Sequence, residues 1–493
     1  MTKKNKIFRP KARRAKGFED RIGARYRAEQ TLLAGAAQVF EAHGFEPLTT
    51  PAFEYTDVLG KFLPDEERPN AGVFSVEDDD KQWLSLRYDL TAPLARFVAE
   101  NYDGLPKPFR RFAFGPVWRN EKPGPGRYRE FLQCDADTVG AAGPAADAEM
   151  IILASKIMQS AKLTAGEYVV RVNDRRLLDA VMTDIGTPDT AVGKAQTATV
   201  LRAIDKLDRL GETGISYLLG AGRKDESGDY TKGAGLDAAG IAKVLAFTRA
   251  GQGDRADTFV ALEKLLGGNG LARDALAQMQ VIDGLVTAAG LDEQTVLFDP
   301  SIVRGLGYYT GCVFETDVTL ETLNEKGQLI RFGSVGSGGR YDGLVARFKG
   351  VEVPATGFSF GVSRFAALLH SLGRLGADVP APVVVLALEP EQMAAYFAMA
   401  DELRAAGIRA EVYMGNSGMR AQMKYADKRG APAVVIVGED ERATGQITVK
   451  DLNLGAKLSE QITDNTQWRE GRPAQHTGPR GELVQLVQRV LVD

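Results

Sequence analysis

Residues 110–140 read RRFAFGPVWRNEKPGPGRYREFLQCDADTVG, two apolar stretches separated by a loop rich in proline and glycine. The first stretch, Phe112–Trp118, is apolar and aromatic and leads into Arg119. The loop Lys122–Gly126 is too rich in Pro and Gly for a helix and suits a turn between strands. The second stretch, after Arg127, has partial period-2 character. The segment therefore predicts a β-hairpin with an arginine where its first strand ends.

The returning strand of this hairpin has one strongly polar face. Alternation sends six side chains to that face: Arg127, Arg129, Phe131, Gln133, Asp135 and Asp137. Arginine forks match phosphate oxygens, an aromatic ring stacks on a base, and amide or carboxylate oxygens accept from an amine or a ring N–H. We expect the face to meet a ligand, because a face buried for stability alone would be apolar. A solvated face with salt bridges is the alternative.

Composition predicts a globular protein of two to four domains, with 493 residues, 44% hydrophobic and 26% charged. The net charge of −4 means that any nucleic-acid surface must be local. No apolar run is long enough for a membrane span, and two cysteines, expected to be buried, fit a reducing compartment, so we expect a cytoplasmic protein. Three dispersed histidines argue against a histidine-based zinc site, and there is no G-x-x-x-x-G-K-[ST] phosphate loop.

Three other segments carry candidate binding residues. In Leu84–Pro93, Asp89 and Thr91 share a face if the segment is extended, and such a pair can hold an ammonium group; a helix N-cap is the alternative. Residues 304–311, RGLGYYTG, and 337–344, SGGRYDGL, are glycine-rich, and glycine lets backbone approach a ligand closely, although the second is also typical of an ordinary hairpin turn. A further strand runs into a helix near Ser363, and Arg364 at its start suits an anion.

The chain predicts five regions in order. Residues 1–176 and 292–375 hold these motifs and flank an alanine-rich helical insertion at 177–291. Residues 376–382 read as a linker. In 383–493 strands alternate with helices, which implies a small, mostly parallel sheet, with 464–480 polar and loose. The N-terminal run Lys3–Lys16 is basic, and we expect a frayed end there.

Together these motifs resemble the histidyl-tRNA synthetases among the class II aminoacyl-tRNA synthetases. Arg119, the loop and the Arg127-x-x-x-Phe131 return resemble motif 2. The helix, strand and proline around 44–51 resemble motif 1, residues 361–365 resemble motif 3, and "LRYDLT" and the two glycine-rich segments resemble histidine-binding motifs. The resemblance implies an α+β catalytic core built on an antiparallel sheet with helices, a helical insertion over the tRNA acceptor stem, and a C-terminal α/β anticodon-binding domain.

The resemblance further implies a homodimer that activates L-histidine with ATP and Mg²⁺ and transfers it to tRNA(His). It gives Arg119 and Arg304 catalytic roles at the α-phosphate. The implied histidine site comprises Asp89, Leu90, Thr91, Arg119, Gln133, Asp137, Arg304, Tyr308, Tyr309 and Tyr341. The implied ATP site comprises Arg119, Glu121, Arg127, Phe131 and Arg364. No protein metal ligand is assigned.

The chain departs from the family at two positions, since Gly307 and Ser363 stand where the family usually has acids. A regulatory paralogue that binds histidine without charging tRNA is the main alternative function. Such paralogues generally lack the C-terminal domain or lose the motif arginines, both of which this sequence retains. An amino-acid ligase without a tRNA partner is disfavoured by the same C-terminal domain.

Overall fold

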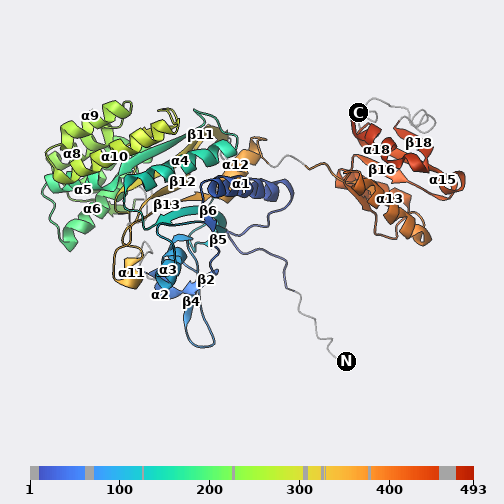
Figure 1. Cartoon of the computed structure of the whole chain (residues 1–493), viewed down its shortest axis with the longest axis horizontal. Coiled ribbons are helices and arrows are strands. Elements are labelled where there is room, and N and C mark those ends of the chain that lie inside the picture. Colours follow the sequence, from blue (N-terminus) through green and yellow to red (C-terminus); the bar gives the residue numbers. More distant parts are fainter. Residues whose placement is uncertain are drawn as a thin grey trace. The chain divides into compact units, whose positions relative to one another are not determined.

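The computed structural model describes residues 10–60, 72–124, 127–224, 228–303, 309–323, 327, 329–375, 379–454 and 474–492. The chain divides into two compact units, Met1–Ala377 and Asp378–Asp493 (Figure 1). Among the described residues, no helix is both long and apolar enough to cross a membrane.

The first unit is built on an eight-stranded sheet. Its strands, in spatial order, are β1 (Glu46–Pro47), β5 (Phe109–Trp118), β6 (Glu130–Val139), β13 (Ala355–Gly361), β12 (Leu329–Arg340), β11 (Cys312–Leu323), β7 (Tyr168–Asp174) and β10 (Val296–Phe298). The two end strands pair in parallel with their neighbours, and the five pairings between them are antiparallel. The predicted antiparallel core and the β5–β6 hairpin are confirmed.

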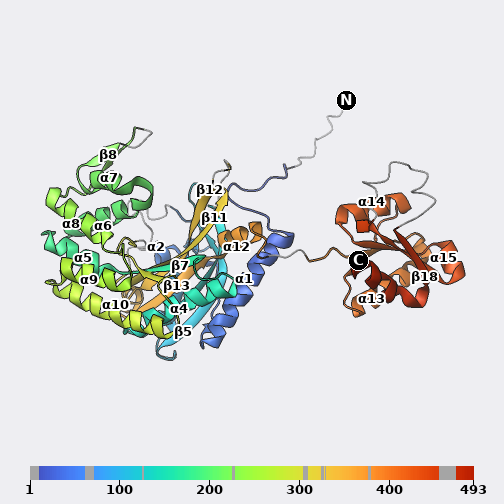
Figure 2. The same ribbon diagram turned by 90° about the horizontal axis from the view of Figure 1, so that it is seen from above.

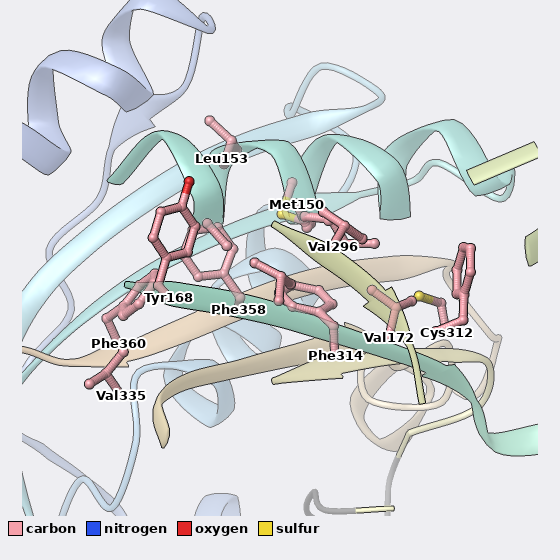
Figure 3. Packing of buried hydrophobic residues seen from close by; sticks show 14 of the residues in the cluster. Met150, Leu153, Tyr168, Val172, Val296, Cys312, Phe314, Val335, Phe358 and Phe360 are labelled. Carbon is pink, nitrogen blue, oxygen red and sulfur yellow. The ribbon is translucent and has the colours of Figure 1, made fainter. Parts of the chain in front are cut away.

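One face of this sheet is apolar and covered by helices. Cys134 and Ala136 of β6 alternate onto it, with Phe314 of β11 and Phe358 of β13 as their companions in the core. Helices α1 (Gly23–Ala42), α4 (Pro144–Ser160) and α12 (Val362–Ser371) contribute to the same core and contact one another or the strands. Figure 3 shows the two phenylalanine rings on the side of the sheet that faces α4. Both cysteines of the chain are buried free thiols, as predicted.

The segment Leu84–Pro93 differs from its predicted extended form. A three-stranded sheet, β2 (Phe53–Tyr55), β4 (Trp83–Leu86) and β3 (Ser75–Glu77), with the short helix α2 (Thr56–Gly60), ends before it. Helix α3 (Thr91–Asn101) then begins, and Asp89 Oδ1 accepts from the backbone N–H groups of Thr91 at 3.1 Å and Ala92 at 2.9 Å. The helix-cap alternative is the one observed, because those two donors have no partner inside the helix.

Residues 177–291 lie almost entirely in helices, which gather at one end of the first unit (Figure 2). The helices are α5 (Arg175–Asp184), α6 (Ala191–Ile204), α7 (Leu207–Leu219), α8 (Ala238–Arg249), α9 (Arg255–Leu266) and α10 (Gly270–Ala288). A short hairpin, β8 (Gly222–Lys224) and β9 (Tyr230–Lys232), interrupts them. Helix α10 packs on α4 and α5, and the buried residues of this region belong to the same hydrophobic core as the sheet.

The glycine-rich residues 337–344 form a strand where a turn was predicted. Gly338 and Gly339 lie inside β12, paired with β11 on one side and β13 on the other. A Cβ at Gly339 would stand 2.5 Å from the carbonyl oxygen of Cys312 and 3.0 Å from Cδ1 of Tyr309. The glycine is therefore needed for close packing of neighbouring groups rather than for a turn. Helix α11 (Ala346–Lys349) follows.

The second unit has a five-stranded sheet with helices on both faces. Its strands, in spatial order, are β15 (Ala410–Val412), β14 (Val383–Val385), β16 (Ala433–Ile436), β17 (Gln446–Asp451) and β18 (Gln475–Pro479). Helices α13 (Met393–Ala405) and α18 (Leu483–Val492) share one core with the sheet, and α14 (Met419–Arg429) shares the core on its other side.

Two expectations for this unit were wrong. The sheet is mixed rather than mostly parallel: β14 pairs in parallel with β15 and β16, whereas β17 is antiparallel to β16 and β18. The connection from β16 to β17 holds only the short helix α15 (Glu439–Thr444), too little chain for a parallel crossover. Strand β18 also lies within 464–480, which was predicted to be loose; residues 464–473 lie outside the described residues.

Candidate active site

The second face of the eight-stranded sheet is polar, as the alternation in β6 predicts. Gln133, Asp135 and Asp137 stand on it, opposite Gly115, Ala113 and Arg111 of β5 respectively. On their other side they pair with Gly361, Ser359 and Gly357 of β13. Small residues thus flank the amide and the two carboxyl groups, which leaves space above the sheet for a ligand.

Several buried polar atoms on this face have no hydrogen-bond partner. They are Arg111 Nε and Nη1, Gln133 Oε1, Asp135 Oδ2 and Asp137 Oδ2. Buried polar groups in folded proteins nearly always have partners, so each such atom calls for an explanation. Their concentration on neighbouring positions of β5 and β6 indicates a surface built to meet polar groups of a ligand.

Asp137 lies at the centre of one group of these side chains. Its Oδ2 is 2.7 Å from Arg111 Nη2, and its Oδ1 accepts from the hydroxyl of Tyr341. Burial raises the pKa of Asp137, while the positive charge of Arg111 and the bond from Tyr341 act in the opposite direction. Burial also raises the pKa of the Tyr341 hydroxyl, which keeps it a donor. The ring of Tyr309 lies over Gly339, one strand beyond Gly357.

Asp135 is the second buried acid of the face and is only 1% exposed. Its Oδ1 accepts from the hydroxyl of Ser359. Burial raises the pKa of Asp135 to about 8, against the opposing charge of Arg111. The carboxyl is therefore mostly protonated at neutral pH, and it is a hydrogen-bond donor as well as an acceptor in that state.

Asp89 and Leu90 border this face at the start of α3. Asp89 is buried, and burial raises its pKa, while the helix-start N–H groups and the nearby Arg119 favour its ionised form. The carbonyl of Leu90 accepts from Arg111 Nη2 at 2.9 Å. The Leu90 side chain packs with Phe131, so this loop connects the acidic group to the end of β6.

Arg119 lies between two aromatic rings. Its guanidinium carbon is 4.4 Å from the ring centroid of Tyr88 and 5.1 Å from that of Phe131. Its Nε makes one long hydrogen bond, 3.5 Å to the carbonyl of Tyr88. The rings hold the cation in place by cation–π attraction while leaving most of its donors available.

Glu121 and Arg127 form an ion pair beside these rings. Glu121 accepts from Arg127 and, at 3.1 Å, from the hydroxyl of Tyr88. Arg127 precedes β6, and so does Arg129, whose backbone N–H donates to the carbonyl of Gly17 at 2.8 Å. The predicted alternation therefore holds only from Phe131 onward, because the strand begins at Glu130.

Helix α12 joins the site through Ser363. The hydroxyl of this residue accepts from the backbone N–H of Leu132 and from Arg21 Nη1, both at 3.1 Å. Arg364 donates to the carbonyls of Phe332 at 2.8 Å and Ser334 at 3.3 Å, and burial lowers its pKa. The serine at the departure from the family pattern thus connects the N-terminal segment, β6 and α12.

The structure brings most of the predicted site residues into one connected set. Contacts lead from Tyr341 through Asp137, Arg111 and Leu90 to Phe131, and from there through Arg119 and Tyr88 to Glu121 and Arg127. Gln133 lies between Phe131 and Asp137 in β6, and Thr91 follows Leu90. Arg304 and Tyr308 lie outside the described residues. Within the described residues, no group of three His, Cys, Asp or Glu side chains has a geometry that could hold a metal ion.

Sequence reasoning missed three members of this set. Arg111, Tyr88 and Ser359 received no role, and Asp135 was placed on the polar face without one. The alternation of β5 could have indicated Arg111, because it shares a parity with Ala113 and Gly115 on a strand predicted to pair with β6. Tyr88 and Ser359 carried no comparable signal, since their neighbours come from distant segments.

Comparisons with known proteins agree with this architecture. The family model described as histidyl-tRNA synthetase matches residues 17–365, and the anticodon binding domain model matches residues 382–467. A histidine–tRNA ligase of Caulobacter vibrioides is 54% identical over 489 residues, covering 99% of this chain and 98% of that protein. A histidine–tRNA ligase of Brucella ovis is 52% identical over 490 residues, covering 99% and 97%.

Solved structures show the same fold. A crystal structure of histidyl-tRNA synthetase from Nostoc has a TM-score of 0.71 and 26% identity, covering 98% of this chain and all of that one. A Bacillus halodurans protein, described as an ATP phosphoribosyltransferase regulatory subunit/histidyl-tRNA synthetase, has a TM-score of 0.65 at 21% identity, covers 85% and 97%, and supports the fold alone. The family models and the close relatives together establish that this chain belongs to the histidyl-tRNA synthetase family.

Proposed function

We propose that the polar face of the eight-stranded sheet is the active site of a histidine–tRNA ligase. The chain activates L-histidine with ATP to histidyl-adenylate and transfers the histidyl group to the 3′ end of tRNA(His). The observation that carries the placement is the set of unpartnered polar atoms on β5 and β6, beside an arginine with spare donors. These groups match an amino acid at one end and a phosphate at the other.

The amino acid occupies the end of the face that holds Asp137. Asp89, Thr91 and Gln133 take the α-amino group; the unpartnered Oε1 of Gln133 supports this role. Asp137 and Tyr309 take the two ring nitrogens. Tyr308, Tyr341 and the Leu90 segment complete the walls. A site that pairs both ring nitrogens leaves its own polar groups unsatisfied with a phenylalanine or leucine ligand, which discriminates strongly against them.

ATP occupies the end that holds Arg119. Arg119 contacts the α-phosphate and the histidine carboxylate, and Arg304 reaches the same phosphate from the opposite side. Phe131 stacks on the adenine, and Glu121 accepts from its amino group. Arg127 and Arg364 bind the γ-phosphate end, so the ion pair between Arg127 and Glu121 rearranges when the nucleotide enters.

Mg²⁺ accompanies the triphosphate in this proposal. When bound, the ion neutralises phosphate charge and favours departure of pyrophosphate. The described part of the chain lacks a three-residue metal cluster, which fits an ion held mainly by the nucleotide itself.

The chemistry requires positioning more than proton transfer. A histidine carboxylate oxygen forms a bond to the α-phosphorus, and the bond to the bridging oxygen breaks to release pyrophosphate. The nucleophile is already ionised, so no general base is needed, and the arginines stabilise charge as it moves. A terminal ribose hydroxyl of the tRNA then attacks the adenylate carbonyl, and AMP leaves.

The remaining parts of the chain serve the tRNA and the assembly. We assign residues 177–291 to the acceptor stem, because a cleft there is lined by the cations Arg202, Lys206 and Lys232. Residues 383–493 bind the anticodon. A homodimer in the cytoplasm is the expected form. The exposed apolar residues Phe53, Tyr55 and Val76 on one face of the three-stranded sheet are the proposed contact with the second copy.

The test is histidine-dependent exchange of pyrophosphate into ATP, with and without tRNA(His). Exchange with histidine and with no other amino acid, together with charging of the tRNA, is the expected result. Histidine binding without exchange would replace the ligase by a regulatory, histidine-binding protein. Light scattering of the same sample tests the dimer, and a Tyr55→Lys variant should shift it toward monomer.

A further inference from the structure

Arg111 is a fully buried cation in the amino-acid end of the site. It lies on β5 directly opposite Asp137 of β6, and it is only 1% exposed. A buried guanidinium destabilises a protein unless charges and hydrogen bonds compensate for its lost hydration. The contacts of this side chain therefore indicate why it is retained.

One nitrogen of Arg111 joins the two ends of the proposed histidine pocket. Nη2 donates to the carbonyl of Leu90 at 2.9 Å and lies 2.7 Å from Asp137 Oδ2. Leu90 belongs to the segment assigned to the α-amino group, and Asp137 is assigned to the ring. The buried Nε and Nη1 atoms have no hydrogen-bond partner, so Arg111 is also not fully satisfied by the protein.

The charges around Asp137 give this cation a second effect. Asp89 and Asp135 are nearby acids, Tyr341 donates to Asp137 Oδ1, and Arg111 is the cation that favours the ionised form of all three carboxyl groups. Burial and the surrounding acids oppose ionisation of Asp137. Removal of the positive charge would therefore favour the neutral carboxylic acid.

We infer that Arg111 is a positioning residue for histidine recognition, which fixes the Asp137 carboxylate in its ionised form and sets its distance from the Leu90 segment. A carboxylate held in this way accepts a hydrogen bond from the imidazole N–H group. Arg111 itself acts through Asp137 and does not take part in the transfer of the adenylyl group. This inference rests on the proposed function and adds a determinant of amino-acid selectivity to it.

The primary test is the variant Arg111→Met, which keeps the length of the side chain and removes its charge. We expect the KM for histidine to rise about tenfold or more at pH 7, because an arginine beside a buried carboxyl typically shifts its pKa by about 1–3 units. The KM for ATP should change by less than about twofold, since Arg111 does not contact the nucleotide end. Pyrophosphate exchange as a function of each substrate measures both.

The pH profile separates this role from a merely structural one. In Arg111→Met the pKa of Asp137 is higher, so the carboxylate needed for ring binding is lost at a higher pH than in the wild type. The ratio of the variant KM to the wild-type KM should therefore fall as pH rises from about 6 to 9. Taking the ratio removes the titration of free histidine, which is common to both proteins.

Arg110→Met is the matched control. Arg110 is the adjacent residue of β5 but pairs with Glu149 and lies over the ring of Phe45, away from the polar face. Its histidine KM should equal that of the wild type. An Arg111→Met protein with an unchanged histidine KM, or with a pH-independent ratio, would overturn the inference.

A double variant covers the case in which Arg111→Met does not fold. Arg111→Met with Asp137→Asn removes both charges of the pair, which is often tolerated where removal of one is not. It should fold and still bind histidine at least about tenfold more weakly than the wild type. Wild-type affinity in that protein would refute the inference. Absence of histidine-dependent exchange in the wild type would instead refute the proposed function.

Discussion

Two buried glutamines, one in each unit, differ in how their amide groups are satisfied. In the second unit, the Gln422 amide accepts from the N–H of Ala387 at 2.8 Å and donates to the carbonyls of Ala387 at 2.7 Å and Ser417 at 2.8 Å. In the first unit, Oε1 of Gln133 is buried without a partner. A polar group buried for structure is satisfied by the protein, whereas one buried for binding keeps an atom for the ligand.

The two sheets differ in the same way. The five-stranded sheet has apolar cores on both faces, so the consecutive strand residues Val383, Val384 and Val385 are all buried. The eight-stranded sheet has such a core on one face, and its other face carries Asp135 and Asp137. A strand with one face left polar and buried is therefore the structural signature of the site, and each prediction below tests that distinction.

The largest effect on stability should come from the apolar face. Phe358→Ala removes a ring that is buried between β6, β12 and the helices, and it should lower the free energy of unfolding by about 3–5 kcal/mol. Histidine-dependent exchange per folded molecule should remain close to that of the wild type. Urea unfolding and exchange on the same sample measure the two quantities, and a selective loss of exchange would blur the distinction between the faces.

The largest effect on catalysis should come from the polar face. Arg119→Ala should reduce exchange about 10²–10³-fold, as expected for loss of a preorganised donor to a reacting group. Its free energy of unfolding should change little, because Arg119 makes only one long hydrogen bond and two ring contacts. Exchange within about twofold of the wild type would remove Arg119 from the reaction centre.

The two glutamines provide an intermediate, paired test. Gln422→Leu leaves the buried backbone groups of Ala387 unpaired and should destabilise the second unit by about 1–3 kcal/mol without changing exchange. Gln133→Leu should do the reverse, with little effect on stability and a raised KM for histidine. Chemical denaturation and exchange kinetics measure the two effects, and equal loss of stability in both variants would contradict the comparison.

The smallest effect concerns the protonation of Asp135. Its pKa of about 8 in the folded state exceeds an unfolded value of about 3.9, so the folded state holds a proton that the unfolded state has lost. Stability should therefore fall as pH rises between those values, by up to about 1.4 kcal/mol per pH unit from this group. Asp135→Asn removes that contribution.

The measurement is the difference in free energy of unfolding between Asp135→Asn and wild type, from about pH 5 to pH 8.5. The difference should change with pH in favour of the variant at the alkaline end. The comparison cancels groups common to both proteins. A difference independent of pH would place the ionised form of Asp135 in the folded state and remove it as a neutral donor.

Sequence patterns predicted the parts of the site that depend on a single strand. Alternation placed Phe131, Gln133 and Asp137 on one polar face, since the side-chain period of a strand leaves no other arrangement. The antiparallel core, the β5–β6 hairpin and the strand into α12 followed from similar local signals. The family resemblance then supplied roles that no local pattern contains.

Features that depend on register or on competing local structures were not predicted. An Asp-x-Thr segment fits both an extended pair and a helix cap, and the cap formed because α3 has unpaired N–H groups to satisfy. The ion pair of Arg111 with Asp137 requires the exact pairing of two strands. The mixed sheet of the second unit likewise depends on which strands become neighbours, which helix and strand periodicity do not specify.

The most direct measurement of the central claim is a crystal structure of the protein with histidine and a non-hydrolysable ATP analogue. The account predicts the histidine amino group within hydrogen-bond distance of Gln133 Oε1, the imidazole at Asp137, and the α-phosphate at Arg119. Histidine bound elsewhere, with the Gln133 oxygen and the Arg111 nitrogens still without partners, would contradict it.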